Sequence, residues 1–543
     1  MVVLAKQREE DFGEPVLASL LASDRTPWYK KPNLRNLYFI LFPACMGIEI
    51  TSGFDSQIIN TVQIVYTWNK YFGHPTGEFE DGQEVYEIEP NIKGFLAAAY
   101  SLGAIISLPF IPFVNKFLGR RWTIMFGSGI SLVGALIQGF SNGTVGMYIV
   151  ARILLGFGIP FCIVAGSSLI GELGYPKERP ILTSLFNSSY FIGQIIAAAV
   201  GLGTVTIPSD WAWRIPSLLQ IAPAMVQICT VLFLPESPRY LISKDRREEA
   251  FDILVKYHAE GDRDSVIVRT EIAQIERTIK MELEDAKQTW WDMFKTAGMR
   301  RRLLISAFLG LFTQWSGNTL ISYYLSDLLN MVDITDSVIK SKINIGIACW
   351  GLVCGTALAL TVPRFKRRTM YLTCASALLC VYIAWTISME RFMNTQAKPA
   401  AILTIFFIFA YSPAYNLGYN ALTYTYLVEI FPYSGRSQGL SWFQFYGRGA
   451  GFFATYVNPV GLSRIAWKWL IVYCCWLGFE LVFIYFFFPE TSGRTLEELS
   501  FMFEGKEKAN EVAAAGYQQK DGEFERKEST AHVEVREHTK HFA

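Results

Sequence analysis

The chain is poor in charge. Charged residues make up only 18% of its 543 residues, whereas an ordinary soluble domain carries about 25%. Hydrophobic residues account for 51%, and the mean hydropathy is +0.25. A single buried core cannot absorb that much apolar chain. Because the apolar residues fall in runs of about 20, the length that crosses a hydrocarbon layer, we expect lipid to be the main solvent.

Other residue types are scarce or lack a functional arrangement. The five histidines all lie outside the apolar runs, which excludes a histidine proton relay and leaves carboxylates. The nine cysteines lie in or beside apolar runs without metal-ligand spacing, so we expect no disulfide framework, metal site or cofactor. The formal net charge of +1 gives no reason to expect a nucleic-acid partner. No Ser-His-Asp set or phosphate loop is visible in the runs, which argues against an enzyme.

Twelve apolar runs have the length of a membrane span. Their approximate bounds are 36–62, 92–114, 122–141, 145–171, 181–206, 211–234, 302–329, 341–362, 369–390, 399–428, 437–461 and 467–488. The expected fold is therefore an all-α membrane protein with twelve transmembrane helices in two six-helix bundles, joined by a cytoplasmic helical linker. The first bundle covers 36–234, the linker 235–301 and the second bundle 302–490, with cytoplasmic tails at 1–35 and 491–543.

The basic residues set the orientation. Clusters around Arg120, Lys177, Arg367 and Arg436 follow alternate spans, and the positive-inside rule places these loops in the cytosol. The loop at 66–91, on the other side, is acidic. Both termini are then expected to be cytoplasmic, and no cleaved signal peptide is expected.

Three cytoplasmic motifs occur twice, about 250 residues apart. The pairs are Asn115–Arg121 with Pro363–Arg368, Glu172–Pro176 with Glu429–Pro432, and Pro235–Arg239 with Pro489–Arg494. This near-constant spacing indicates duplication of a six-span unit. Two such units place a binding site between them near the middle of the bilayer, and rocking of one unit against the other exposes it alternately. The organisation favours a transporter.

Four motifs carry a resemblance to a known family. They are Gly53-Phe-Asp55, Arg152-Ile-Leu-Leu-Gly-Phe-Gly158, Pro235-Glu-Ser-Pro-Arg-Tyr-Leu241 and Pro489-Glu-Thr-Ser-Gly-Arg-Thr-Leu-Glu-Glu498. Together they resemble the sugar porters of the major facilitator superfamily. Gln314-Trp-Ser-Gly-Asn318, followed by Tyr323-Tyr324, is similar to the fungal lactose-permease-like branch. The resemblance implies a plasma-membrane transporter of a small sugar that works as a monomer.

Asp55 and Arg152 are ionisable groups inside apolar runs, where each costs at least ~2.5 kcal/mol if it faces lipid. Both are therefore expected to face inward. The family resemblance implies that the aspartate accepts a proton and that the arginine tunes its pKa. The alternative is a static pair that only holds two helices together.

A polyol substrate needs amides, hydroxyls and aromatic faces. The residues that match family substrate positions are Asn187, Gln314, Asn318, Thr319, Tyr323, Tyr324, Tyr424 and Arg448. Individually, each amide could instead make an ordinary interhelical hydrogen bond. Arg448 departs from the uncharged residues usual at its position. It could bind sugar hydroxyls or an acidic sugar, pair with a structural carboxylate, or extend to the membrane interface. For the other deep acids, Glu49 and Glu480, interhelical hydrogen bonding is the favoured interpretation, and contact with the cavity is the alternative for Glu49.

The resemblance also implies a cytoplasmic gate of charged residues that locks the two bundles while the outer side is open. Its expected members are Arg120, Arg121, Glu172, Arg179, Glu236, Arg239, Arg367, Arg368, Glu429, Arg436, Glu490 and Arg494. Ordinary topology-setting charge is the alternative explanation.

These observations predict import of a neutral sugar by alternating access, coupled to protons. Disaccharides of the lactose or cellobiose type come first and hexoses second. A facilitative uniporter and a membrane sugar sensor without transport remain the alternatives. The short tail of about 50 residues argues against a sensor.

Overall fold

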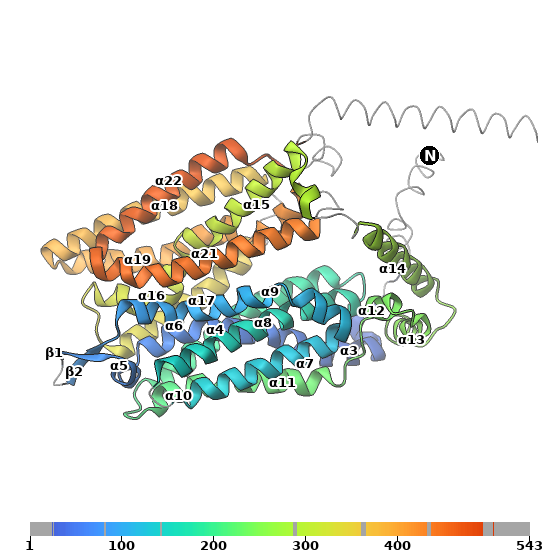
Figure 1. Ribbon diagram of the computed structural model, residues 1–543, viewed down its shortest axis with the longest axis horizontal. Coiled ribbons are helices and arrows are strands. Elements are labelled where there is room, and N and C mark those ends of the chain that lie inside the picture. The colour runs from blue at the N-terminus through green and yellow to red at the C-terminus, as the bar shows by residue number, and fades with distance from the viewer. Residues whose placement is uncertain are drawn as a thin grey trace, which may run out of the picture.

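The computed structural model describes residues 24, 26–80, 83–141, 144–285, 290–359, 365–431, 436–491 and 503. Two groups of roughly parallel helices lie side by side, and a smaller group of helices, α12 to α14, lies at one end (Figure 1). The helices before Leu234 form the first group, here called the first bundle. The helices after Thr296 form the second bundle.

The first bundle contains eight α-helices that run nearly its full length in single or paired segments. They are α3 (Pro32–Leu41), α4 (Gly47–Gln63), α6 (Pro90–Ser107), α7 (Ile111–Gly139), α8 (Val145–Leu173), α9 (Arg179–Thr204), α10 (Trp211–Leu219) and α11 (Ile221–Val231), with the π-helical turn η2 (Phe42–Met46) between α3 and α4. Glycines allow very close crossings here: a Cβ atom on Gly156 would overlap the carbonyl oxygen of Tyr100, and one on Gly53 would overlap that of Tyr190. Small residues at such crossings are typical of helices packed in lipid.

The second bundle repeats this plan. Its elements are α15 (Ala297–Trp315), α16 (Asn318–Asn330), α17 (Ser337–Ala359), α18 (Arg367–Thr395), α19 (Lys398–Tyr415), η5 (Asn416–Asn420), α20 (Thr423–Ile430), α21 (Arg436–Ile465), η7 (Ala466–Lys468) and α22 (Trp469–Phe487). Each of the twelve predicted spans is covered by one helix or by consecutive helical segments. The span at 302–329 is broken at Gly317, whose φ of 100° is in the left-handed region that suits glycine.

Seven helical stretches of the described chain are long and apolar enough on their own to cross a membrane. Of the remaining predicted spans, 181–206 is one helix of 26 residues, whereas 211–234 and 302–329 each consist of two shorter helices, which a bilayer accepts where the freed backbone groups face protein. One predicted boundary was wrong. The second span was expected to reach residue 114, but α6 ends at Ser107 and α7 begins at Ile111. A kink at Gly119 (φ 82°, ψ −177°) separates the cytoplasmic start of α7 from its membrane portion.

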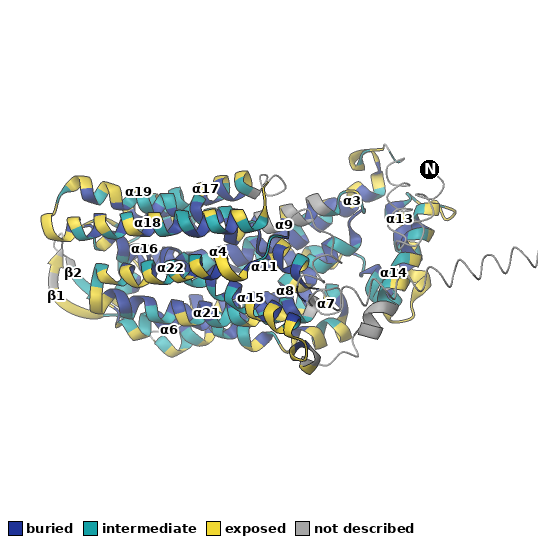
Figure 2. Ribbon diagram, turned by 90° about the horizontal axis from the view of Figure 1, so that it is seen from above, coloured by how far each residue is buried: buried dark blue, intermediate teal, exposed yellow. Residues whose placement is uncertain are grey.

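Burial shows where lipid would lie. Figure 2 shows exposed residues along the outer sides of both bundles and buried residues between the helices. Large apolar side chains are among the exposed ones: Phe39 is 69% exposed, Phe233 74% and Phe486 69%. Water would make these side chains costly, whereas hydrocarbon accepts them.

The outer loop after the first span has structure that was not predicted. It forms the short helix α5 (Tyr66–Phe72) and an antiparallel hairpin of β1 (His74–Glu80) and β2 (Gln83–Glu87). Because this loop is rich in acidic residues, its sequence predicts only a polar connection.

The predicted linker helices are present at the opposite end, as α12 (Pro238–Ser243), α13 (Arg247–His258) and α14 (Val266–Asp285), followed by η3 (Trp290–Phe294). They attach to the first bundle through a buried cluster. Glu271 of α14 bonds Arg179 at 2.5 Å and Nδ1 of His258 at 2.8 Å. Burial opposes ionisation of Glu271, but the neighbouring His258 and Arg179 outweigh it and hold the pKa of this carboxyl below its usual value of 4.5.

His258 itself faces two acceptors. Its Nδ1 meets the Glu271 carboxylate, and its Nε2 lies 3.2 Å from the carbonyl oxygen of Leu173 at the end of α8. The cluster ties the linker to the cytoplasmic end of the first bundle.

Candidate functional site

The two bundles are hydrogen-bonded to each other at the end that the basic clusters place outside the cell. Gln57 donates to Asn344 at 2.6 Å, Lys93 bonds Asp327 at 2.5 Å, and the Ser337 hydroxyl donates to the carbonyl of Ile64 at 3.0 Å. Asn60 adds two further bonds to α16. We call these contacts the outer seal.

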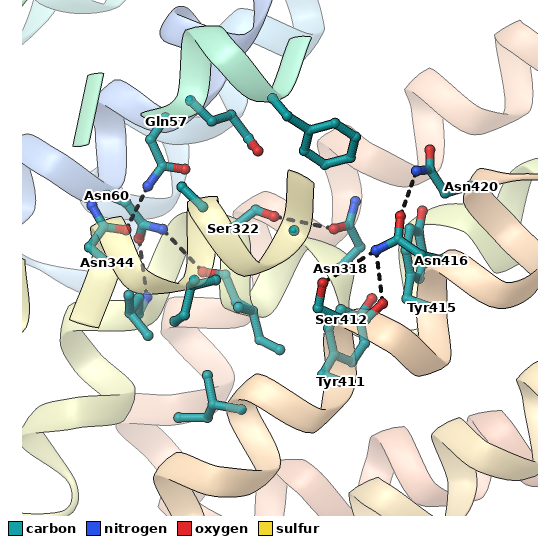
Figure 3. A pocket seen from close by; sticks show the side chains of 18 residues that line it. Gln57, Asn60, Asn318, Ser322, Asn344, Tyr411, Ser412, Tyr415, Asn416 and Asn420 are labelled. Atoms are coloured by element: carbon teal, nitrogen blue, oxygen red, sulfur yellow. Dashed lines mark hydrogen bonds between the residues drawn. The ribbon is translucent and has the colours of Figure 1, made fainter. Parts of the chain in front are cut away.

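A polar pocket lies directly beside the outer seal (Figure 3). It has a volume of about 180 Å³ and draws its amides from both bundles. Its polar lining residues are Gln57, Asn60, Gln194, Asn318, Ser322, Asn344, Tyr411, Ser412, Tyr415, Asn416 and Asn420. We call it the outer pocket. Many of its amides already bond one another, as Asn420 bonds Asn416 at 2.5 Å.

A second, larger cavity of about 420 Å³ adjoins the outer pocket, because Asn318, Ser322 and Asn420 line both. We call it the inner pocket, and its volume lies in the range of ~300–1,000 Å³ found for small-molecule sites. Its other polar and aromatic lining residues are Glu49, Ser52, Ser56, Tyr100, Ser101, Tyr190, Thr313, Gln314, Thr319, Tyr323, Tyr419, Thr423, Tyr424, Phe443, Gln444 and Arg448. Amides, hydroxyls and aromatic rings thus converge on one space between the bundles.

The structure brings six of the eight predicted substrate residues to the inner pocket: Gln314, Asn318, Thr319, Tyr323, Tyr424 and Arg448. Tyr424 is 56% exposed although it belongs to a helix of the bundle interior, because the cavity beside it is open. Its hydroxyl accepts a bond of 2.7 Å from Gln444. Gln444 was not predicted as a site residue.

The other two predicted substrate residues behave differently. Tyr324 is fully buried away from the cavity, and its hydroxyl donates to the carbonyl of Thr455 in α21 at 2.5 Å. The adjacent residue, Tyr323, takes the cavity position. Asn187 belongs to α9, but its side chain lies outside the part of the chain that the structure describes.

Asp55 of α4 and Arg152 of α8 lie together in the first bundle, and both are fully buried. The guanidinium donates to the backbone carbonyl of Asp55 at 3.3 Å and lies 5.2 Å from the ring centre of Tyr100, which lines the inner pocket. Within the described residues, neither carboxylate oxygen of Asp55 has a hydrogen-bond partner. Their charges interact, yet the side chains are not joined by an ion pair in this conformation. Neither Asp55 nor Arg152 lines the inner pocket itself, but Arg152 lies over the ring of Tyr100, which does.

A second couple crosses the cavity. Glu49 of α4 is only 8% exposed, and it lines the inner pocket together with Arg448 of α21. The two charges interact across the space between the bundles. The sequence favours interhelical hydrogen bonding for Glu49 and leaves contact with the cavity as the alternative; the structure places it on the cavity wall. It lies six residues before Asp55, and sequence spacing alone could not tell which face of α4 meets the cavity.

The predicted gate residues form one cluster in each bundle. In the first, Arg120 bonds Glu172 at 3.1 Å, and Glu236 accepts the backbone N–H groups of Arg120 and Arg121 at 3.1 and 3.3 Å. Ser237 also donates to Glu172. Burial raises the pKa of Glu236, although these backbone donors partly offset the effect.

The second bundle contains the same cluster. Arg367 bonds Glu429 at 3.3 Å, and Glu490 accepts the backbone N–H groups of Arg367 and Arg368 at 2.9 and 3.2 Å. Thr491 donates to Glu429 at 2.5 Å, in the place of Ser237. The repeated sequence motifs therefore correspond to a repeated three-dimensional arrangement. These bonds hold helices within a bundle, and they do not join one bundle to the other.

The remaining predicted gate residues do not share one location. Arg179 bonds Glu271 of the linker at 2.5 Å. Arg239 lies on α12, at the cytoplasmic end of the first bundle. The side chain of Arg436 and the whole of Arg494 lie outside the described residues.

Comparison with known proteins decides the family. The model of the family described as "Sugar (and other) transporter" matches residues 40–503, most of the chain. The chain belongs to this sugar transporter family. Membership establishes a membrane transporter rather than an enzyme. It supports the sugar-porter resemblance, whereas the lactose-permease-like branch stays a prediction.

Several yeast and mould members of the family are similar over most of this chain. A high-affinity glucose transporter of Kluyveromyces lactis is 25% identical, with 88% of this chain and 87% of the relative covered. The low-affinity glucose transporter HXT3 of Saccharomyces cerevisiae is 25% identical over 76% of this chain and 73% of its own length. A probable quinate permease of Aspergillus clavatus is 24% identical, with 86% of each chain covered.

A solved structure confirms the fold of this family member. The inward open conformation of the xylose transporter XylE from E. coli superposes with a TM-score of 0.69 at 20% identity, covering 86% of this chain and 99% of that protein. The predicted all-α membrane fold of the major facilitator type is therefore confirmed.

Proposed function

We propose that this sugar transporter family member imports a neutral sugar across the plasma membrane by alternating access, together with a proton. Disaccharides of the lactose or cellobiose type are the first candidates, and hexoses are the second. The observation that carries the proposal is the pair of adjoining polar cavities between the bundles, the inner and outer pockets.

The lining of this cavity fits a polyol. Gln314, Asn318 and Gln444 supply groups that donate and accept, and Tyr323 and Tyr424 supply aromatic faces for the C–H surface of a sugar ring. The similar proteins named as glucose transporters act on sugars of this kind.

Charge balance favours a neutral substrate. Arg448 could bind a carboxylate, and one relative is named a probable quinate permease. However, Glu49 lines the same cavity as Arg448. An anionic substrate would therefore meet a carboxylate as well as a guanidinium, and like charges repel.

Asp55 and Arg152 support proton coupling. A buried carboxylate without a hydrogen-bond donor can take up a proton at low cost, and a neighbouring arginine favours its release. Movement of Arg152 relative to Asp55 during the transport cycle would then link proton uptake to the conformational change. We assign the proton to Asp55 on these grounds.

The conformation described here supports the alternating-access cycle. The outer seal closes the outer side, while Tyr424, nearer the cytoplasmic end, is largely exposed. We infer that this is the inward-facing state of a monomeric transporter. Opening of the outer seal would produce the opposite state.

Uptake into proteoliposomes tests the proposal. We expect labelled lactose, cellobiose or glucose to accumulate when an inward proton gradient is imposed, and quinate to enter far more slowly. Asp55→Asn should abolish accumulation while leaving sugar exchange at equilibrium intact. Glu480→Gln is the matched control, because Glu480 is an equally buried acid that lines neither pocket; its carboxylate accepts at 2.8 Å from Tyr419, whose side chain lines the inner pocket. It should retain accumulation.

Other outcomes would contradict parts of the proposal. Uptake that ignores the gradient, with a fully active Asp55→Asn variant, would indicate a uniporter. Sugar binding without uptake would indicate a sensor. Quinate accumulation in preference to all three sugars would overturn the neutral substrate.

A further inference from the structure

Asn60 occupies an unusual place in the outer seal. It belongs to α4 of the first bundle, is only 2% exposed, and reaches into α16 of the second bundle. Its Nδ2 donates to the carbonyl oxygen of Ile321 at 3.1 Å, and its Oδ1 accepts the backbone N–H of Leu325 at 3.1 Å. Figure 3 shows this amide among the side chains of the outer pocket.

The two backbone groups that Asn60 binds are a matched pair. In an unbroken α-helix the N–H of residue i+4 donates to the carbonyl of residue i, so Leu325 and Ile321 would bond each other. Helix α16 is distorted between them, because Tyr324 has φ −131° and ψ 28°. The Asn60 side chain therefore contacts both backbone groups at a kink, offering a donor to one and an acceptor to the other. Few side chains can do this, since it takes an amide with both functions.

The kink lies at Tyr324, the second of the two adjacent tyrosines of α16. Tyr323, just before it, lines the inner pocket, and Tyr324 is buried with its hydroxyl on the carbonyl of Thr455. The local geometry of α16 thus decides which tyrosine reaches the cavity. An amide that stabilises this geometry affects the shape of the inner pocket without contacting a bound substrate.

We propose that Asn60 is a positioning residue that couples closure of the outer seal to the shape of the substrate site. When the seal is closed, its amide stabilises the kink in α16 and so holds Tyr323 at the cavity. When the bundles separate on the outer side, the amide withdraws, the Ile321 carbonyl and the Leu325 N–H bond each other, and α16 becomes regular. This rests on the proposed function for the identity of the cavity as the substrate site.

Gln57 provides a matched control. It belongs to the same helix and the same seal, but its partner is the side chain of Asn344 and no backbone group of α16. Gln57→Leu weakens the seal without removing support from the kink, whereas Asn60→Leu removes both. Asn60→Asp keeps the acceptor for Leu325 but loses the donor, and it sets a carboxylate oxygen against the Ile321 carbonyl.

The first measurement does not depend on the substrate. In the full-length protein, with the exposed cysteines Cys229, Cys349, Cys380 and Cys475 replaced by serine, Tyr323→Cys reports access to the cavity through its rate of reaction with a hydrophilic maleimide. We expect Asn60→Leu and Asn60→Asp each to change this rate at least about fivefold, because each removes one or both bonds at the kink. Gln57→Leu should change it less than about twofold. Equal effects of Asn60→Leu and Gln57→Leu, or a wild-type rate in Asn60→Asp, would overturn the proposal.

The second measurement uses lactose, cellobiose and glucose binding in a double-mutant cycle. If Asn60 acts through Tyr323, then Asn60→Leu and Tyr323→Phe are strongly non-additive in Kd, whereas Gln57→Leu and Tyr323→Phe are additive. Additive effects for Asn60 would overturn the coupling to the substrate site. A wild-type protein that binds none of the three sugars would refute the proposed function, and the maleimide result would still decide the role of Asn60.

Discussion

The first bundle holds Arg120, Glu172 and Glu236 in the arrangement in which the second bundle holds Arg367, Glu429 and Glu490. The cavity walls of the two bundles are unlike each other. The first contributes Glu49, serine hydroxyls, Tyr100 and Tyr190, with the Asp55–Arg152 couple behind Tyr100, whereas the second contributes amides, further tyrosines and Arg448. The arrangement of the charged clusters is thus repeated in both bundles, and the composition of the cavity walls is not.

The largest expected effect concerns helix packing, where the two bundles differ most. A Cβ atom on Gly156 would overlap the backbone of Tyr100, whereas the nearest atom to one on Gly310 of the second bundle is the backbone nitrogen of Gly447 at 2.9 Å. We expect Gly156→Ala to cost about 3 kcal/mol or more, because backbone cannot move aside as a side chain can. Gly310→Ala should cost less. The yield of monodisperse protein and its Tm check the order.

Gly129→Ala is the control for this comparison, since a Cβ atom there meets nothing within 4 Å. It should be neutral or slightly stabilising, because alanine favours a helix by about 1 kcal/mol over glycine. Equal tolerance of alanine at Gly156 and Gly310 would show that the crossings of the two bundles are equally loose.

The next effect tests Glu49 and Arg448, the charged residues that line the inner pocket from the two bundles. Arg448→Gln should slow sugar uptake about tenfold, because it leaves Glu49 uncompensated in the cavity. Glu49→Gln should act similarly and admit anionic sugars such as lactobionate. The double variant should recover part of the loss. Initial uptake rates of lactose and lactobionate measure this. A double variant whose loss equals the product of the single losses would show that the two residues act separately.

A smaller effect tests the two equivalent charged clusters, through Glu236 in the first bundle and Glu490 in the second. Glu236→Ala and Glu490→Ala each remove the acceptor for two backbone N–H groups, and each should cost about 2 kcal/mol. Thermal unfolding measures both. Because the clusters are equivalent, the two losses in Tm should agree. A clear difference would mean that duplication has preserved the contacts but not their energetic weight.

The smallest effect concerns the cluster of Arg179, His258 and Glu271, which attaches the linker to the first bundle. The pKa of Glu271 is lowered on folding, so its contribution is present above the usual value of 4.5 and is lost as the pH falls through the lower folded value. We expect protease cleavage within the linker to increase at that acidic end in the wild type. Glu271→Gln should lower the local stability of the linker by about 1–2 kcal/mol, so its cleavage should be faster already at neutral pH.

Glu276→Gln serves as the control on the same helix, because the Glu276–Arg247 pair is largely solvent-exposed. It should leave the cleavage rate unchanged. Identical behaviour of both glutamates would show that the buried cluster does not fasten the linker.

The sequence allowed the spans, the orientation and the repeat to be predicted, because run length, basic clusters and motif spacing are local properties. It also indicated six residues of the inner pocket, since polar groups in apolar helices must turn away from lipid. It could not assign Tyr323 and Tyr324 to different faces, because their separation depends on a kink stabilised from another helix. For the same reason it did not reveal Asn60, Gln444 or the cavity position of Glu49. Contacts between the bundles are the part that local patterns do not encode.

The start of the first transmembrane helix depends on a residue far along the chain. The backbone N–H groups of Asn33 and Leu34, in the first turn of α3, donate to the carboxylate of Glu260 at 3.0 and 3.1 Å. A carboxylate at this position satisfies free N–H groups and the positive end of the helix dipole. During synthesis this cap cannot form until residue 260 has left the ribosome. The first helix to enter the membrane is thus completed only after the whole first bundle has been made, which makes the Glu260 contact a late step in biogenesis.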